Sequence, residues 1–212
     1  IKGDFFNRRL ITELAVYYME LDGRQRSVYS KPPGQANATP ILINGDQEFT
    51  GVEIILNWLI TDTMNLGFLT TWRDEESTWE PFYDARGELV EDTLSDTADT
   101  DYTITFDWSP QISKGRLDLR AEYIFYENSI LEDPTIIHPE GLKGYGEDRK
   151  LLNARAAWST DDGKWTFGLW GKNLLDNEVT SGVDNLTLAS FGTPFVRIEP
   201  PRTYGIEAAY NF

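Results

Sequence analysis

Hydrophobic and polar residues alternate with a period of two in eight segments of the chain. Asp101–Pro110 is the clearest, with Tyr102, Ile104, Phe106 and Trp108 in one phase and polar residues in the other. Successive side chains of a strand point to opposite faces, so each segment predicts a β-strand with one apolar face. The expected strands are Arg9–Leu21, Glu48–Ile60, Asn65–Arg73, Asp101–Pro110, Leu117–Tyr126, Leu151–Ser159, Trp165–Asn173 and Thr203–Phe212, with Ile1–Phe5 ending an earlier strand.

Short and long connections alternate between these strands. The short turns are Phe6–Arg8, Thr61–Met64, Ser109–Lys114 and Thr160–Gly163, and the long polar segments are Asp22–Gln47, Asp74–Thr100, Glu127–Lys150 and Leu175–Pro201. This alternation is typical of transmembrane barrels, whereas soluble β-domains usually have shorter loops throughout. We therefore expect an all-β fold, a transmembrane antiparallel up-and-down β-barrel. A soluble β-sandwich is the alternative, because period-two alternation alone fits both.

Composition narrows the function classes. Aromatic residues make up 13% of the chain, and no apolar run is long enough for a transmembrane helix. The net charge of −16 argues against nucleic-acid binding. Cysteine is absent and His138 is the single histidine, so neither thiol chemistry nor a histidine-based metal cluster is expected. The chain also lacks G-x-S-x-G, P-loop and H-E-x-x-H motifs. We expect no enzyme activity, no cofactor and no metal.

Five short elements resemble the TonB-dependent outer-membrane receptor family. Gly171–Glu178 is similar to that family's N-L-F/L-D-K/N-x-Y element, although Val179 stands where the family usually has Tyr. Pro201–Ile206 resembles the P-R-T-Y-G opening of its final strand, and the chain ends on a similar aromatic-x-Phe sequence. Upstream, Gly3–Leu10 and Thr50–Glu53 resemble a recurring turn and a recurring strand start.

The resemblance implies a plugged barrel of about 22 strands. This chain (residues 1–212) would supply its C-terminal eight or so strands, and the plug domain and the TonB-contacting segment would precede Ile1. The implied function is uptake of a scarce solute, such as a ferric siderophore, haem, cobalamin or an oligosaccharide, with energy coupled through TonB. The implied location is the outer membrane of a Gram-negative bacterium, and the implied partners are TonB, membrane lipid, the barrel assembly machinery and a small-molecule or metal-chelate ligand.

Two groups of residues are candidates for specific roles. The row Tyr204, Ile206, Tyr210 and Phe212 is expected to face lipid, and the resemblance implies that this final strand is read by the assembly machinery. The strongly acidic segment Asp74–Asp101 contains candidate ligand contacts, which are Trp79, Phe82, Tyr83, Glu80 and Asp84. The alternative interpretation is that this acidic segment is a solvated extracellular loop with no ligand-binding role. Trp108, Trp158, Trp165, Tyr102 and Tyr123 are expected to lie in interfacial girdles.

The sequence is also compatible with two alternative functions. A complete eight-stranded outer-membrane barrel with a structural or adhesive role would have its lumen filled by side chains. A soluble carbohydrate-binding β-sandwich would place the aromatic rows in a dry core instead of against lipid.

Overall fold

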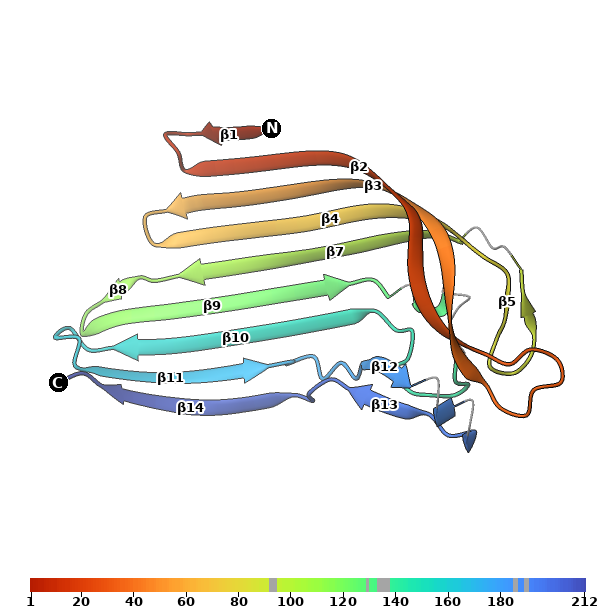
Figure 1. Cartoon of the computed structure of the whole chain (residues 1–212). Coiled ribbons are helices and arrows are strands. Elements are labelled where there is room, and N and C mark those ends of the chain that lie inside the picture. The colour runs from red at the N-terminus through yellow and green to blue at the C-terminus, as the bar shows by residue number, and fades with distance from the viewer. Residues whose placement is uncertain (92–94, 129, 133–137, 185–186, 189–190) are drawn as a thin grey trace.

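The computed structural model describes residues 1–91, 95–128, 130–132, 138–184, 187–188 and 191–212, and the side chains of residues 95–98 and 132 are also left out of the description. The described residues form one large antiparallel sheet and two small hairpins (Figure 1). In the large sheet the strands follow one another in chain order, β1-β2-β3-β4-β7-β9-β10-β11-β14, and β8 pairs with β9. This is the up-and-down arrangement expected from the alternating connections.

The bounds of the large-sheet strands are β1 (Lys2–Phe5), β2 (Leu10–Ser30), β3 (Thr39–Thr61), β4 (Met64–Trp79), β7 (Ser95–Trp108), β8 (Gln111–Ile112), β9 (Gly115–Tyr126), β10 (Arg149–Ser159), β11 (Trp165–Lys172) and β14 (Thr203–Tyr210). The small hairpins pair β5 (Phe82–Tyr83) with β6 (Leu89–Val90), and β12 (Thr180–Asp184) with β13 (Phe195–Ile198). A short 3-10 turn, η1, covers Ile130–Glu132.

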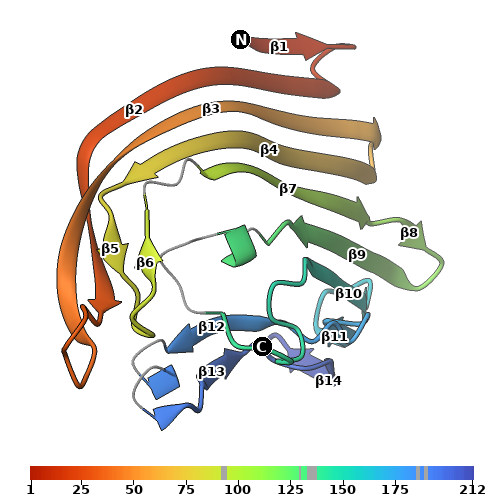
Figure 2. The same cartoon turned by 90° about the vertical axis from the view of Figure 1, so that its right-hand side faces the viewer.

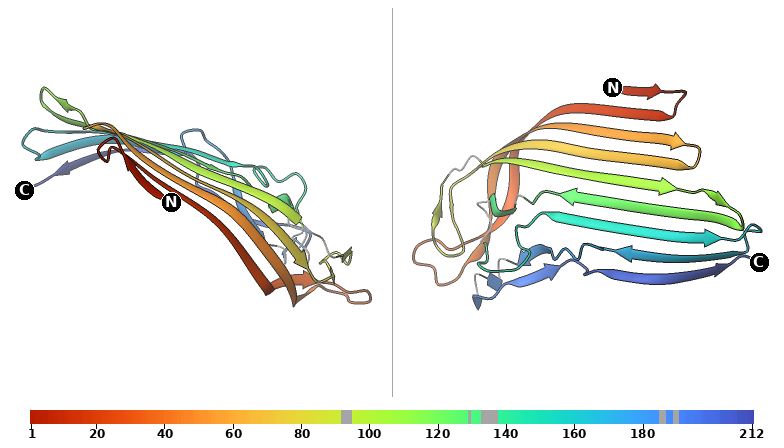
Figure 3. Two further views of the ribbon diagram at one scale, coloured as in Figure 1. Left: turned by 90° about the horizontal axis from the view of Figure 1, so that it is seen from above. Right: turned by 180° about the vertical axis from the view of Figure 1, so that it is seen from behind.

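The eight expected strands are confirmed, but two of the expected loops are wrong over much of their length. The segment Asp22–Gln47 is mostly strand, because β2 continues to Ser30 and β3 starts at Thr39. Likewise, β4 continues to Trp79. The 21 residues of β2 reach roughly 70 Å, about twice the hydrocarbon thickness of a bilayer. The β2–β3 hairpin therefore extends far beyond any membrane span, and it bends over the loop-bearing end of the sheet (Figures 1 and 3).

The inner face of the sheet is the face that carries Ile43 and Trp79. These two side chains pack with Phe82 of β5, and β5 lies on the concave side of the curved sheet (Figure 2). Period two and the strand register extend this face across the sheet. One of its rungs reads Asn57, Gly67, Thr105, Glu122 and Asn153.

The outer face is apolar over the same strands. The neighbouring rung points the other way and reads Leu56, Phe68, Ile104, Tyr123 and Leu152. A second outer rung reads Leu119, Ala156, Leu169 and Ile206. The apolar phases of separate strands are thus in register, and together they make one continuous apolar surface.

The described residues do not show a second sheet packed against this apolar surface. The soluble sandwich needs such a sheet, so the fold does not support that alternative. The described part of the chain contains no helix that is long and apolar enough to cross a membrane.

Candidate ligand-binding wall on the inner face

Charged side chains of the inner face pair across neighbouring strands. Arg120 of β9 donates to Asp107 of β7 at 3.4 Å. Asn153 of β10 donates to the Glu122 carboxylate at 3.1 Å, and Arg155 pairs with Glu207 two strands away. A row of paired charges facing inwards suits a polar lumen, because single-residue alternation separates it from the apolar outer face.

The lower hollow, named for its position nearer the short turns, is a cavity of about 340 Å³ in this charged wall. Trp170 of β11 lies in it, half-buried, with its indole packed directly over Gly205 of β14. A Cβ at Gly205 would lie 2.6 Å from the ring, so glycine lets the indole lie close to the sheet. The side chains bordering the hollow are Arg120, Glu122, Asn153, Arg155, Trp170, Lys172 and Glu207.

The upper hollow is a cavity of about 330 Å³ at the loop-bearing ends of β9 and β10. Its polar lining is Tyr126, Asn128, Arg149, Thr180, Ser181 and Glu199. The Arg149 guanidinium contacts the Glu199 carboxylate at 3.0 Å, and the Arg149 Nε is buried without a hydrogen-bond partner.

Two loops that are distant in sequence hold the upper hollow together. The Thr180 N–H donates to the Gly144 carbonyl at 2.9 Å, and its hydroxyl donates to the Lys143 carbonyl at 3.0 Å. The Lys143 ammonium contacts the Glu178 carboxylate at 2.5 Å, a hydrogen bond that raises the pKa of Lys143. These bonds join the 127–148 connection to β12, so the hollow is preformed.

Trp79 and Phe82, two of the sequence-predicted ligand contacts, lie in a small core. Each is 5% exposed and packs with Val28 and Ile43, and Val90 covers the cluster. The guanidinium groups of Arg24 and Arg26 lie 5.7 Å from the Trp79 ring. The sequence showed two aromatic residues in a polar segment, but the structure uses them to dock β5 against the β2–β3 hairpin.

Glu80 and Asp84 organise the same hairpins. The Glu80 carboxylate accepts hydrogen bonds from the Asn44 backbone N–H (2.9 Å) and side-chain amide (3.0 Å). Both bonds favour the ionised form and lower the pKa of Glu80. The Asp84 carboxylate accepts from the N–H groups of Arg86 and Glu88, each at 2.9 Å. Tyr83 is half-buried.

The acidic segment Asp74–Asp101 is only partly a loop. Its first carboxylates lie on β4 and its last ones on β7, and residues 92–94, which include Asp92, lie outside the described residues. The described side chains contain no group of three or more His, Cys, Asp and Glu placed to hold a metal ion. His138 is half-buried, with its Nδ1 2.8 Å from the Tyr145 hydroxyl.

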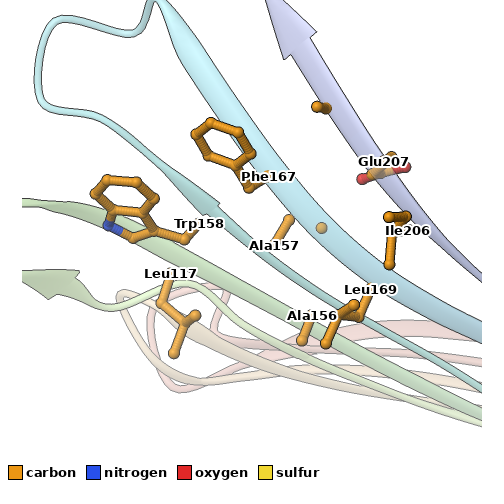
Figure 4. A pocket seen from close by; sticks show the side chains of 10 residues that line it. Leu117, Ala156, Ala157, Trp158, Phe167, Leu169, Ile206 and Glu207 are labelled. Atoms are coloured by element: carbon orange, nitrogen blue, oxygen red, sulfur yellow. The ribbon is translucent and has the colours of Figure 1, made fainter.

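Aromatic residues cluster on the outer face near the short turns. Trp165 lies 5.6 Å from Phe167 and 4.7 Å from Tyr210, measured between ring centroids. Trp158 stacks with Phe167 on the next strand at 6.2 Å, beside an outward-facing hollow of about 480 Å³ (Figure 4).

A second outer-face cluster lies nearer the loop-bearing ends of the strands. Tyr102 stacks with Phe125 at 4.9 Å and lies 6.0 Å from Tyr123. These positions suit the two interfacial girdles expected from the sequence.

A sheet that is apolar outside, polar inside, and long-looped at one end defines the wall of an outer-membrane type of β-barrel. Residues 1–174 match the family model described as "TonB dependent receptor-like, beta-barrel". The chain belongs to the TonB-dependent receptor family. Nothing matches the chain in comparisons with curated proteins or with solved structures. The match ends at Leu174, so it includes strands β1–β11 and leaves out the motif around Pro201 and β14.

Sequence reasoning found the charged members of the inner face but missed its hollows. Asn153, Arg155 and Trp170 all lie on the polar phase of their strands, and Trp170 is an aromatic residue out of phase with Trp165, Phe167 and Leu169. The position of Trp170 in the polar phase of its strand was therefore the sequence signal that could have indicated the lower hollow. Thr180 and Glu199 carried no such signal, because long connections bring them to the wall.

Proposed function

We propose that this chain forms part of the wall of an outer-membrane receptor that takes up a scarce solute with energy supplied through TonB. The observation that carries the proposal is the division of the sheet into a continuous apolar outer face and an ion-paired inner face with two polar hollows. The family of the chain is one of receptors and transporters in the outer membrane of Gram-negative bacteria. We propose that location, and TonB as the partner, for this protein.

We also propose that further strands complete the barrel, up to the about 22 that the family resemblance implies. The strand order places β1 and β14 at opposite margins of the sheet (Figures 1 and 2). A margin in hydrocarbon leaves backbone N–H and C=O groups unpaired, each at a cost of several kcal/mol, so both margins need partners. This favours the larger barrel over a self-contained eight-stranded one. The plug and the TonB-contacting segment would come from elsewhere in that receptor.

Loops at the extracellular end would capture the solute before it reaches the inner wall. Tyr83 is half-buried and is the least buried of the aromatic candidates there, so it would contact the solute. Trp79, Phe82, Glu80 and Asp84 would act by holding the hairpins that present it. The final strand β14, with its exposed Tyr204, Ile206, Tyr210 and Phe212, would be the segment that the barrel assembly machinery reads.

The test is localisation and uptake in the native host. The full-length receptor is expected in the outer-membrane fraction, as a species whose electrophoretic mobility changes on boiling. Growth on the limiting solute, or its accumulation, is expected to fall to the level of receptor-deleted cells when TonB is removed. A soluble product, or uptake that does not depend on TonB, would contradict the proposal.

A further inference from the structure

The two inner-face hollows share one set of chemical groups. Each contains an aromatic ring, an asparagine side chain and an arginine–glutamate ion pair. The lower hollow has Trp170, Asn153 and Arg155–Glu207, and the upper hollow has Tyr126, Asn128 and Arg149–Glu199. Their volumes are also nearly equal, about 340 and 330 Å³.

The ion pairs make the hollows polar without giving them a strong net charge. In the lower hollow Arg120 also contacts Glu122 at 3.9 Å, which leaves Lys172 as the cation in excess within the described lining. A multiply charged ligand, whether cation or anion, would meet a like charge from each pair. A neutral ligand with many hydroxyl groups can donate to the carboxylates and accept from the guanidinium and amide groups.

The aromatic rings add a flat apolar surface to each set of polar groups. Trp170 is supported by the sheet at Gly205, and Tyr126 is 46% exposed at the mouth of the upper hollow. An aromatic ring that packs on one side and is open on the other suits the C–H face of a pyranose, while the neighbouring polar groups suit its hydroxyls.

The hollows lie in line along the same two strands. Trp170 of β11 pairs with Arg155, which pairs with Arg120, and Arg120 is six residues from Tyr126 on β9, so the two aromatic residues are about 20 Å apart along the strands. We infer that the inner wall binds an uncharged linear oligosaccharide, with one sugar ring on Tyr126 and another, nearer the periplasm, on Trp170. The inference rests on the proposed uptake function and specifies its substrate class.

The test uses the full-length receptor in detergent and four neutral linear probes: maltohexaose, cellohexaose, laminarihexaose and xylohexaose. Calorimetry is expected to detect binding of at least one. Trp170→Ala and Tyr126→Ala are each expected to weaken that binding about tenfold or more. Trp170→Phe is expected to retain most of the affinity, because it keeps a ring. Affinity is expected to change little between about 0.05 and 0.5 M NaCl, since neutral ligands are not screened.

The control variant is Trp165→Ala, which removes an outer-face tryptophan from the same strand. It is expected to leave oligosaccharide affinity unchanged. Failure of all four probes to bind the folded receptor would overturn the inference, as would unaltered affinity in Trp170→Ala. If that variant lowers only the melting temperature, Trp170 packs against another part of the receptor, and the inference also fails. If the receptor instead takes up a metal chelate in a TonB-dependent manner, the oligosaccharide inference is wrong but the proposed uptake function holds.

Discussion

Two glycines in neighbouring turns meet very different surroundings. Gly115 has a φ of 135°, and a Cβ there would lie 2.0 Å from the Ser159 carbonyl oxygen of the next strand. Gly163 has a φ of 67°, with no atom within 4 Å of the Cβ position. Both backbone conformations favour glycine, but only Gly115 also lies against rigid backbone.

Gly115→Ala is therefore expected to destabilise the barrel by about 3 kcal/mol or more, through strain and collision together. Gly163→Ala, the matched control, is expected to cost only about 1 kcal/mol from strain alone. Urea titration of the full-length receptor in micelles, followed by the electrophoretic difference between folded and unfolded forms, measures both. Equal costs would show that the β10 backbone near Ser159 moves aside easily.

At this scale the sequence predicted which residues carry chemistry better than it predicted what they contact. The charged inner residues Asp107, Arg120 and Glu122 were visible as the polar phase of their strands. The small core around Trp79 was not visible, because Val28 and Ile43 lie far from it in sequence and only strand pairing brings them together. Composition alone made that tryptophan appear free for a ligand.

The β2–β3 hairpin is longer than the sequence pattern predicted. Beyond the apolar rows, its outer face has a rung with Glu20, Glu48 and the neighbouring Glu76 opposite one another. Glutamate is a poor strand former, and like charges directly opposite are destabilising, so local pattern predicts a loop there. The two strands continue past this rung because Val28 and Ile43, further along their inner face, are buried against Phe82 of β5. Tertiary packing therefore determines where these strands end. The hydrophobic pattern of a single sequence does not show that packing.

The Glu80–Asn44 contact ties this hairpin to the next one, and its strength is expected to depend on pH. Because the docked state favours the ionised Glu80 carboxylate, the pKa of Glu80 is lowered. The stabilisation is present above the ordinary carboxyl pKa and is lost as the pH falls through the lowered value. The chain contains no cysteine, so a spin label at Gln35→Cys reports motion of the hairpin tip.

At neutral pH, Glu80→Gln is expected to raise the mobility of that label, and the difference from the parent should vanish as the pH falls through the lowered pKa of Glu80. Glu88→Gln is the matched control, because Glu88 is exposed and its side chain contacts Arg86 loosely, at 3.7 Å. A label that is equally mobile in the parent and in Glu80→Gln from pH 7 down to pH 3 would mean that the small core alone docks the hairpin.

At the scale of the whole molecule, the alternation of short and long connections was enough to predict an up-and-down sheet with loops at one end. The motifs pointed to the family, and the match over residues 1–174 confirms it. The apolar phase of each strand was also readable from sequence. The register that joins those phases into one surface was not readable, because it depends on backbone pairing between strands.

The continuous apolar outer surface predicts a different cost for a charged substitution depending on whether lipid or water covers it. Ile206 is 83% exposed on the outer face of β14, and in water such a position accepts arginine at almost no cost. If lipid covers the face, Ile206→Arg is expected to cost about 2–4 kcal/mol, the penalty of a charge near the bilayer midplane. Ala209→Arg, on the same strand but the inner face, should cost far less, because its guanidinium enters a polar lumen. Folding of both variants of the full-length receptor into phospholipid vesicles, titrated with urea, gives the two free energies. A tolerant Ile206 together with an intolerant Ala209 would reverse the assignment of the two faces.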